Sequence, residues 1–321
     1  SCHMSMAKTQ AEVQGQAVAA QGDGFFDPAH PLHAAGMEGV SCTLCHQIGD
    51  AGLGTKESFT GGYSVDTGTE PPDRQAFGPY EQPFARPMQM HTGYVPLYGA
   101  HTGKAEICAT CHNLYTPYVD AQGEVLGEFP EQTPFTEWQN SSYGRGVPCQ
   151  SCHMPQTRGG VVISTMPGRL SAREPFFQHW FVGGNATMLR ILSAWGGELG
   201  VTADPAHLDD TLARVVDQVE QRAAVLKVEE LGLENGVLTA RLEVTALTGH
   251  KFPTSFPARR AWLLRTWDRF ALPWPFARTV LVIGEPRVVP KGLDTAALER
   301  WQEEIRGELE SLYESAQGHR L

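Results

Sequence analysis

The sequence has few basic side chains and lacks a long apolar run. Lys and Arg together number 25 against 36 Asp and Glu, which gives a formal net charge of −11. Affinity for nucleic-acid phosphates needs a basic face, so we expect no nucleic-acid partner. No uninterrupted apolar run approaches the roughly 18 residues of a membrane span, so we expect no transmembrane segment in this chain.

The composition also excludes disorder and fibrous repeats. Of the 321 residues, 41% are apolar and 19% are charged, which is typical of a folded protein that buries a core. At about 150 residues per domain, this length predicts roughly two domains. The 22 Pro and 34 Gly predict that much of the chain is loop.

Cysteine, in contrast, is present in a regular pattern. Six of the seven cysteines form three Cys-x-x-Cys pairs, and a histidine follows each pair directly. These motifs are Cys42, Cys45 and His46; Cys108, Cys111 and His112; and Cys149, Cys152 and His153. The seventh cysteine, Cys2, is followed by His3 and Met4, as Cys152 is by His153 and Met154. We therefore expect Cys2 and His3 to end a truncated fourth motif, and the chain to be a piece of a longer precursor.

This spacing suits the covalent attachment of haem c. Two thiols three positions apart reach the two vinyl groups of one haem, and the next histidine supplies the proximal nitrogen to iron. Structural zinc, disulfides and redox dithiols also use paired cysteines. None of these explains a histidine after every pair, and three complete copies favour haem. We therefore predict haem c at three complete attachment sites and one truncated site.

The attachment chemistry also predicts a compartment. Haem is normally attached to apocytochromes outside the cytoplasm, so the motifs predict a periplasmic or extracellular protein. Each haem brings two propionates against one iron charge, so the assembled protein should be more acidic than its formal charge. Every cysteine except Cys2 is used in a complete attachment motif, which leaves none for a structural disulfide.

Histidines outside the motifs are the predicted source of the sixth iron ligands. Five of them are candidate distal ligands, namely His33, His91, His101, His179 and His250. His33 and His101 lie within nine residues of the next attachment motif, and His91 is close by. His179 lies among aromatic residues that would stack against a porphyrin. His250 lies in a predicted turn after a strand-like run.

Methionine is the competing axial ligand, and the nearest candidates are Met88, Met90 and Met154. Methionine more often fills gaps in a core, so we favour bis-histidine coordination. Two other histidines are assigned no ligand role, because His207 opens a predicted helix and His319 lies two residues from the end of the sequence.

The sequence predicts a mainly α fold with long loops, in three parts. Residues 1–165 hold every attachment motif and should form a haem-cored block with short helices after each motif and little sheet. Residues 166–265 should form a helical pair and a small β-element that cap the haems. Residues 266–321 form a divergent tail, for which we predict no ligand and no chemistry.

Local signals place the elements after the haem block. Asn185 is a predicted cap of one helix, and Asp204 with Pro205 should start a second. Strands are predicted over 224–231 and 237–247, joined by a hairpin turn at 234–236. In the tail, apolar residues at helical spacing predict a docking helix over 294–315, and the short stretches 280–283 and 287–289 are β-like.

Residues 1–265 resemble the large multihaem cytochromes c of bacterial electron-transfer systems. The matching stretches are 39–48, 107–117, 128–134, 138–155, 179–185 and 248–262. This resemblance implies stacked haems that pass electrons, usually with bis-histidine iron, in the periplasm or at the cell surface. It also supports His179 and His250 as ligands. The expected partners are other redox proteins or copies of the chain itself.

The tail differs from that family. The stretches 265–270, 273–278 and 283–290 look like the end of lysophospholipid-acyltransferase-like proteins. Those enzymes need a histidine and an aspartate separated by four residues as the base pair for acyl transfer. No such spacing occurs in this chain, so acyltransferase activity is not expected.

Two functions and one assembly are compatible with these motifs. Multihaem reductases often mark the catalytic haem with a lysine in place of the motif histidine, whereas every motif here ends in histidine. Five candidate distal histidines serve at most four haems, so no iron need stay open. We therefore predict a non-catalytic electron carrier with closely spaced, mostly bis-histidine haems. The alternatives are an oxidoreductase that reduces a small nitrogen or sulfur oxyanion at one open haem, and a subunit of a conductive filament.

The motifs make a prediction about covalent mass. Denatured full-length chain, expressed with a haem-attachment system, should show three haem additions, or four if the truncated motif holds a singly tethered haem. Mass spectrometry of the denatured protein measures this number directly. A chain that binds zinc and carries no haem would contradict the assignment.

Overall fold

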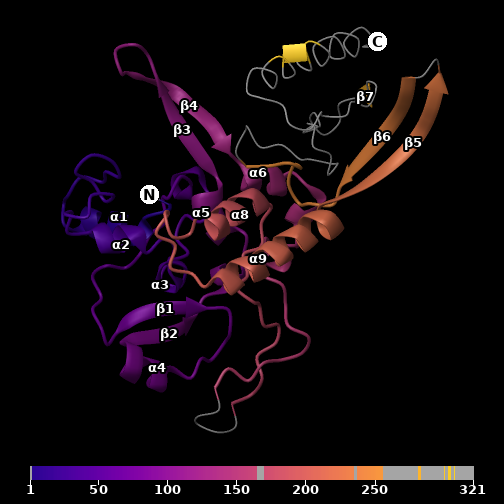
Figure 1. Ribbon diagram of the computed structural model, residues 1–321. Helices are drawn as coiled ribbons and strands as arrows, with labels where there is room; N and C mark the ends of the chain where they lie inside the picture. Colours follow the sequence, from indigo (N-terminus) through magenta and orange to yellow (C-terminus); the bar gives the residue numbers. More distant parts are fainter. Residues whose placement is uncertain are drawn as a thin grey trace. The chain divides into compact units, whose positions relative to one another are not determined.

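The computed structural model describes residues 2–164, 170–234 and 237–255, together with 281–282, 300, 303–304 and 307. The chain divides into two compact units (Figure 1). The first unit comprises Ser1–Gln218 and the short segment Gly249–Arg259, and the second comprises Val219–Thr248 and Arg260–Leu321. His250 therefore belongs to the unit that carries the attachment motifs.

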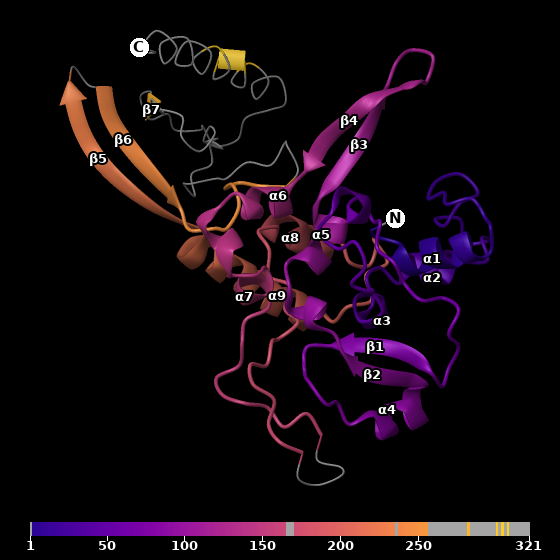
Figure 2. The same cartoon turned by 180° about the vertical axis from the view of Figure 1, so that it is seen from behind.

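Each complete attachment motif lies on a short helical turn. These turns are α3 (Cys42–Cys45), α5 (Glu106–His112) and α7 (Gln150–His153), the last of which is labelled in Figure 2. Side chains three and four positions apart share one face of a helix. A helical turn therefore points both thiols and the following imidazole to the same side. The sequence predicts helices after the motifs, whereas the structure has the motifs themselves helical.

The first unit contains two small sheets that the sequence does not predict. Strands β1 (Arg74–Gly78) and β2 (Tyr94–Tyr98) pair in parallel, with Arg74 opposite Tyr94. Parallel strands need a crossover, and helix α4 (Ala85–Thr92) provides it. Gly93 ends that helix in the left-handed region with φ of 75°, where glycine pays no steric cost.

The second sheet is an antiparallel hairpin of β3 (Leu114–Val119) and β4 (Val125–Gln132). Asp120 closes its turn by accepting hydrogen bonds from the backbone amides of Gln122 and Glu124, each 2.9 Å long. Two tyrosines, a threonine and a valine follow the motif of α5 within β3, and their strand propensity outweighs the helical expectation. The structure is therefore mixed rather than mainly helical.

The remaining elements of the first unit are short helices and 3₁₀ turns. They are α1 (Ser5–Val13), α2 (His33–Met37), η1 (Lys56–Ser58), η2 (Ala100–Gly103), α6 (Pro134–Gln139), η3 (Ser142–Arg145), α8 (Ala186–Ala194) and α9 (Pro205–Gln218). The predicted helical pair is confirmed, and α8 and α9 lie side by side (Figures 1 and 2). Asn185 caps α8 by accepting a hydrogen bond of 3.3 Å from the Met188 amide.

The second unit contains the predicted hairpin. A π-helical turn, η4 (Val219–Ala223), leads into β5 (Ala224–Glu234), which pairs antiparallel with β6 (Val237–Ala246). The turn residues 235–236 lie outside the described residues, as does most of the predicted helix 294–315. Strand β7 (Leu281–Val282) pairs with β6. In the described part of the chain, no helix is long and apolar enough to cross a membrane.

Many of the buried apolar side chains of the first unit form two small clusters, and others such as Leu44 and Ile48 are buried outside them. One joins Met4, Ala7 and Ala11 of the N-terminal helical region to Phe25. The other joins Ala105, Ala109 and Phe135, between α5 and α6. Large apolar side chains nevertheless remain exposed, among them Phe181 at 63%, Trp195 at 55% and Met188 at 47%. The described chain thus leaves substantial apolar surface that its own side chains do not cover.

Candidate haem-binding site

Thiols from different motifs meet around helix α5. All seven cysteines keep their thiols rather than forming disulfides. The Cys108 thiol hydrogen-bonds with that of Cys149, an interaction that raises the pKa of Cys108 and lowers that of Cys149. A hydrogen bond with Cys2 likewise raises the pKa of Cys111. The second motif is therefore in contact with the third motif and with Cys2.

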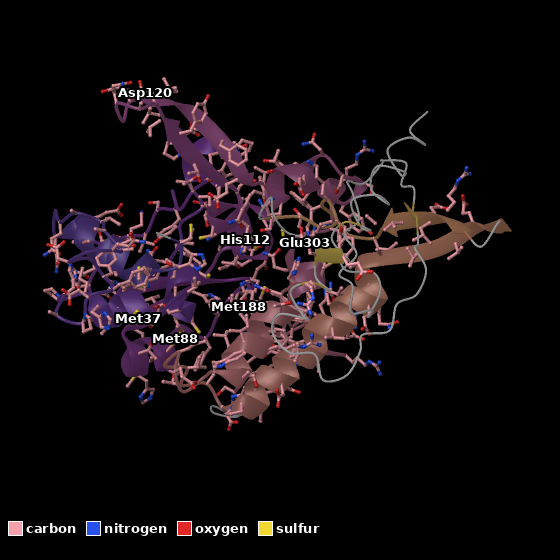
Figure 3. All side chains as sticks on the ribbon, turned by 45° about the horizontal axis from the view of Figure 1, so that its top comes forward. Met37, Met88, His112, Asp120, Met188 and Glu303 are labelled. Carbon is pink, nitrogen blue, oxygen red and sulfur yellow. The ribbon has the colours of Figure 1, made fainter. Side chains whose placement is uncertain are left out.

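The histidines of these motifs also lie close together, around His112. His112 is an exposed residue, yet neighbouring atoms desolvate its imidazole, and this desolvation is the main cause of its lowered pKa. The nearby His153 and His3 lower that pKa further. Figure 3 shows His112 well away from Asp120, which lies at the tip of the β3–β4 hairpin. Three of the four predicted attachment sites thus adjoin one another at α5.

His46, the histidine of the first motif, lies opposite the predicted distal ligand His179. The two ring centroids are 6.2 Å apart, with an angle of 40° between the ring planes. The His46 Nδ1 lies 2.6 Å from the carbonyl oxygen of Phe77, at the end of β1. Burial lowers the pKa of His179, and the proximity of His46 lowers it further.

His153, the histidine of the third motif, lies opposite the predicted distal ligand His250. These ring centroids are also 6.2 Å apart, and the rings are inclined by 21°. The His153 Nδ1 hydrogen-bonds to the carbonyl oxygen of Val182, and the His250 Nδ1 lies 3.0 Å from the carbonyl oxygen of Lys251. The two distal ligands that the sequence favours most, His179 and His250, therefore each lie beside a motif histidine, a pairing that the sequence alone does not predict.

Both spacings fit two imidazoles on opposite sides of one iron. With a metal–nitrogen bond of about 2.0 Å and about 1.1 Å from nitrogen to ring centre, the two centroids would be roughly 6.2 Å apart. Ordinary ring contacts also fall between about 4.5 and 7 Å. Here, however, the same spacing occurs twice, and each time it joins a motif histidine to a distal histidine. The residues present therefore fit a bis-histidine haem.

Backbone carbonyls fix which imidazole nitrogen is able to bind a metal. A carbonyl oxygen only accepts, so a ring nitrogen that bonds to it carries the proton. In His46, His153 and His250 that nitrogen is Nδ1, which leaves the metal-binding lone pair on Nε2. His33 on α2 has the same arrangement, with its Nδ1 at 2.9 Å from the Phe25 carbonyl oxygen.

His101 has the opposite arrangement. It is 8% exposed, and its Nε2 donates a hydrogen bond of 2.8 Å to the Ile48 carbonyl oxygen. Its lone pair is therefore on Nδ1, which faces the backbone at Gly99, where an added Cβ would lie 3.1 Å away. Ligation by His101 would require this buried contact to break, so its ligand role stays a prediction.

The remaining candidate axial ligands are His91 and the competing methionines, most of which are exposed. His91 lies at the C-terminal end of α4, which also carries Met88 and Met90, 37% and 69% exposed. Met154 directly follows the helical turn of the third motif and is half-buried. The structure pairs none of these four side chains with a motif histidine, and their ligand roles stay untested.

Gln150, inside the third motif, is a functional candidate that the sequence does not reveal. Its side chain is 4% exposed, and its Nε2 donates to the carbonyl oxygens of Thr102 and Lys104 at 3.1 and 2.8 Å. Its Oε1 is buried without a partner among the described residues. Lys104 also lines a cavity of about 410 Å³ with His101 and Phe77. Gln150 thus ties the third motif to the loop that precedes the second.

Comparisons with known proteins add little to this site. No family model and no curated protein matches the chain. A solved structure, the penta-heme cytochrome c552 from Thermochromatium tepidum, is similar to it at 17% identity and a TM-score of 0.38. The match covers 72% of this chain and 48% of the other, so the chain spans about half the length of that structure. A likeness of this degree is too weak to assign fold or function, and nothing in these comparisons reproduces the acyltransferase-like resemblance of the tail.

The His46–His179 pair makes a prediction about spin state. In holoprotein, His179→Ala should convert the iron of the first motif from low-spin to high-spin, because one of its two imidazoles is lost. Absorption and electron paramagnetic resonance of the ferric protein measure the change. His207→Ala is the matched control, because His207 is an exposed histidine on α9. An entirely low-spin spectrum for His179→Ala at full haem content would exclude His179 as a ligand.

Proposed function

We propose that this chain is a multihaem c-type cytochrome that transfers electrons through closely spaced, mostly bis-histidine haems. The observation that carries this proposal is the pair of 6.2 Å centroid spacings, each between a motif histidine and a distal histidine. The hydrogen bonds from Nδ1 of His46, His153 and His250 to carbonyl oxygens support it, because they leave Nε2 as the ligating nitrogen.

The proposed attachment residues are the paired thiols and the histidine of each motif. Two imidazole pairs, His46 with His179 and His153 with His250, would hold two irons axially. The thiol contacts around α5 support close spacing of the second, third and truncated sites. A bound haem supplies a one-electron couple between ferric and ferrous iron.

The chain's own residues would keep each site six-coordinate and orient its ligands. The carbonyls of Phe77 and Val182 hold the motif imidazoles of the first and third sites in one tautomer and orientation. Exposed apolar side chains such as Phe181 and Met188 offer surface that packs against a porphyrin and excludes water from it. At the irons of the first and third motifs, imidazole on both faces would leave no coordination position for a substrate.

Location and partners follow from the same chemistry. Covalent haem attachment supports a periplasmic or extracellular protein. Electron transfer requires a redox partner, and we infer that this is another redox protein or a second copy of the chain.

Carbon monoxide binding and a potentiometric titration test this function together. In fully reduced holoprotein the irons of the first and third motifs should bind no carbon monoxide, because histidines would occupy both of their axial positions, so binding should stay below one molecule per haem. The haems should titrate over a broad range because neighbouring charged irons interact. His250→Ala, which opens one iron, is the positive control for carbon monoxide binding. Stoichiometric binding by the unaltered protein would contradict a pure electron carrier and favour the oxidoreductase.

A further inference from the structure

The segment that carries His250 is packed closely onto helix α6 and the turn that follows it. Gly249 packs closely against two aromatic residues, because an added Cβ would lie 3.1 Å from Trp138 Cδ1 and 3.3 Å from Tyr143 Cβ, tighter than most Cβ contacts. Six residues further on, the Ser255 hydroxyl donates a hydrogen bond of 2.9 Å to the Gln132 side chain. Both ends of the segment 249–255 are therefore held by neighbouring residues of the same unit.

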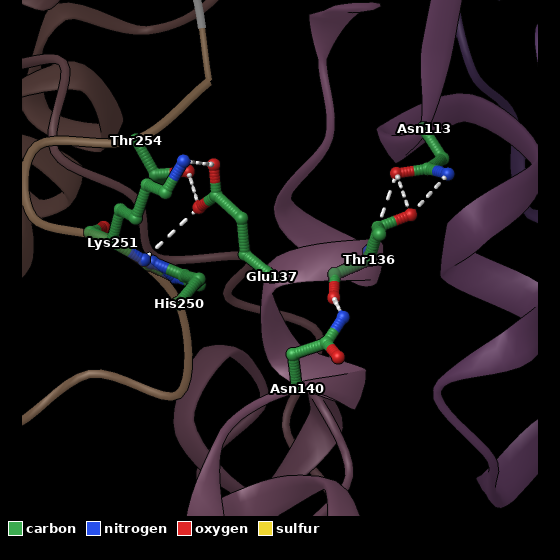
Figure 4. A network of polar contacts seen from close by, with 7 residues as sticks. All are labelled: Asn113, Thr136, Glu137, Asn140, His250, Lys251 and Thr254. Atoms are coloured by element: carbon green, nitrogen blue, oxygen red, sulfur yellow. Dashed lines mark hydrogen bonds and ion pairs between the residues drawn. The ribbon is translucent and has the colours of Figure 1, made fainter.

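Between these ends, Glu137 of α6 binds the segment through a single carboxylate (Figure 4). Its Oε2 accepts a hydrogen bond of 3.0 Å from the Lys251 amide and one of 2.6 Å from the Thr254 hydroxyl. Its Oε1 lies 3.9 Å from the Lys251 ammonium group. The Glu137 side chain is 14% exposed, so water competes little for these contacts.

The amide that Glu137 binds belongs to the residue immediately after His250. The carbonyl of that same residue, Lys251, lies 3.0 Å from the His250 Nδ1 and thereby sets the tautomer of the imidazole. By binding the Lys251 amide, Glu137 holds the residue whose carbonyl fixes the orientation of the His250 ring and which ring nitrogen carries the proton. It acts on the ring through Lys251.

Helix α6 is anchored at its other side to the second attachment motif. Asn113, which directly follows His112, is fully buried and donates a hydrogen bond of 2.9 Å to the Thr136 hydroxyl (Figure 4). Thr136 neighbours Glu137 in the sequence, and its carbonyl accepts a hydrogen bond of 2.8 Å from Asn140. The helix that holds the His250 segment is thus fixed to the chain that carries His112.

We propose that Glu137 is a positioning residue for His250, which holds the imidazole opposite His153 by clamping Lys251 and Thr254. This inference rests on the proposed function, because it assumes that His250 and His153 ligate one iron. It assigns a role to a carboxylate that lies outside every attachment motif.

Four variants of the full-length holoprotein separate this role from a general loss of structure. Glu137→Ala removes all the clamping contacts. Glu137→Gln keeps an acceptor oxygen for Lys251 and Thr254 but removes the charge. Glu128→Ala is the matched control, because it removes an exposed carboxylate that pairs with Lys56 on another element. His250→Ala sets the spectrum of complete ligand loss.

The readout is the ferric spin state by electron paramagnetic resonance, measured with and without added imidazole. A hydrogen bond to a charged group changes an equilibrium by roughly tenfold or more. We therefore expect Glu137→Ala to raise the fraction of high-spin iron at least about tenfold, toward the His250→Ala spectrum. Glu137→Gln and Glu128→Ala should stay low-spin, and free imidazole should restore the low-spin signal of Glu137→Ala.

The outcomes distinguish a failed inference from a failed function. A Glu137→Ala protein that stays low-spin while His250→Ala becomes high-spin would overturn the role of Glu137 and leave the haem assignment standing. A Glu137→Ala protein that loses haem, or does not respond to imidazole, would show a structural role instead and also overturn the proposal. If His250→Ala itself stays low-spin at full haem content, the ligand assignment under the proposed function is wrong.

Discussion

Hydrogen bonds from imidazole Nδ1 to backbone carbonyl oxygens are the interaction on which this site depends. Each such bond puts the proton on Nδ1 and the metal-binding lone pair on Nε2, and it fixes the plane of the ring. His46 obtains its carbonyl from Phe77 in β1, and His153 obtains its carbonyl from Val182, before α8. The small parallel sheet and the chain before the helical pair therefore serve the same purpose, which is to orient a motif imidazole. His101 instead hydrogen-bonds a carbonyl through its Nε2, so the Nδ1–carbonyl hydrogen bond is not shared by every histidine of the chain.

A second constraint is the scarcity of apolar core. The described residues of the first unit bury two small clusters built largely from alanine and phenylalanine, while Phe181, Met188 and Trp195 stay exposed. A loop-rich chain of this kind gains little free energy from its own side chains, because buried apolar area is the main stabilising contribution. Flat porphyrins covalently attached to helical turns would supply the missing apolar surface. Under the proposed function, cofactor binding and stability are therefore two aspects of one arrangement, in which the haems form much of the core.

Much of the local structure follows from the sequence, whereas the tertiary contacts do not. Asn185 and Pro205 mark helix starts through capping and the fixed φ of proline, and the strands 224–234 and 237–246 have a clear alternating pattern. The pairing of β1 with β2 has no local signal, because a parallel register is set by packing across a crossover. Equally, no sequence pattern identifies the carbonyl that bonds a given histidine, or the contact of Glu137 with a loop more than a hundred residues away. His179 and His250 were accessible from sequence because their neighbours resemble a known family, while the roles of Phe77 and Glu137 required coordinates.

The central claim is that two imidazoles lie on opposite sides of each of at least two irons. Near-infrared magnetic circular dichroism of the oxidised holoprotein tests it most directly, because the low-spin charge-transfer band has a different energy for bis-imidazole and for methionine–imidazole ligation. The account predicts a spectrum dominated by the bis-imidazole band. A dominant methionine–imidazole band, or high-spin bands in place of the low-spin ones, would contradict the pairing of His46 with His179 and of His153 with His250.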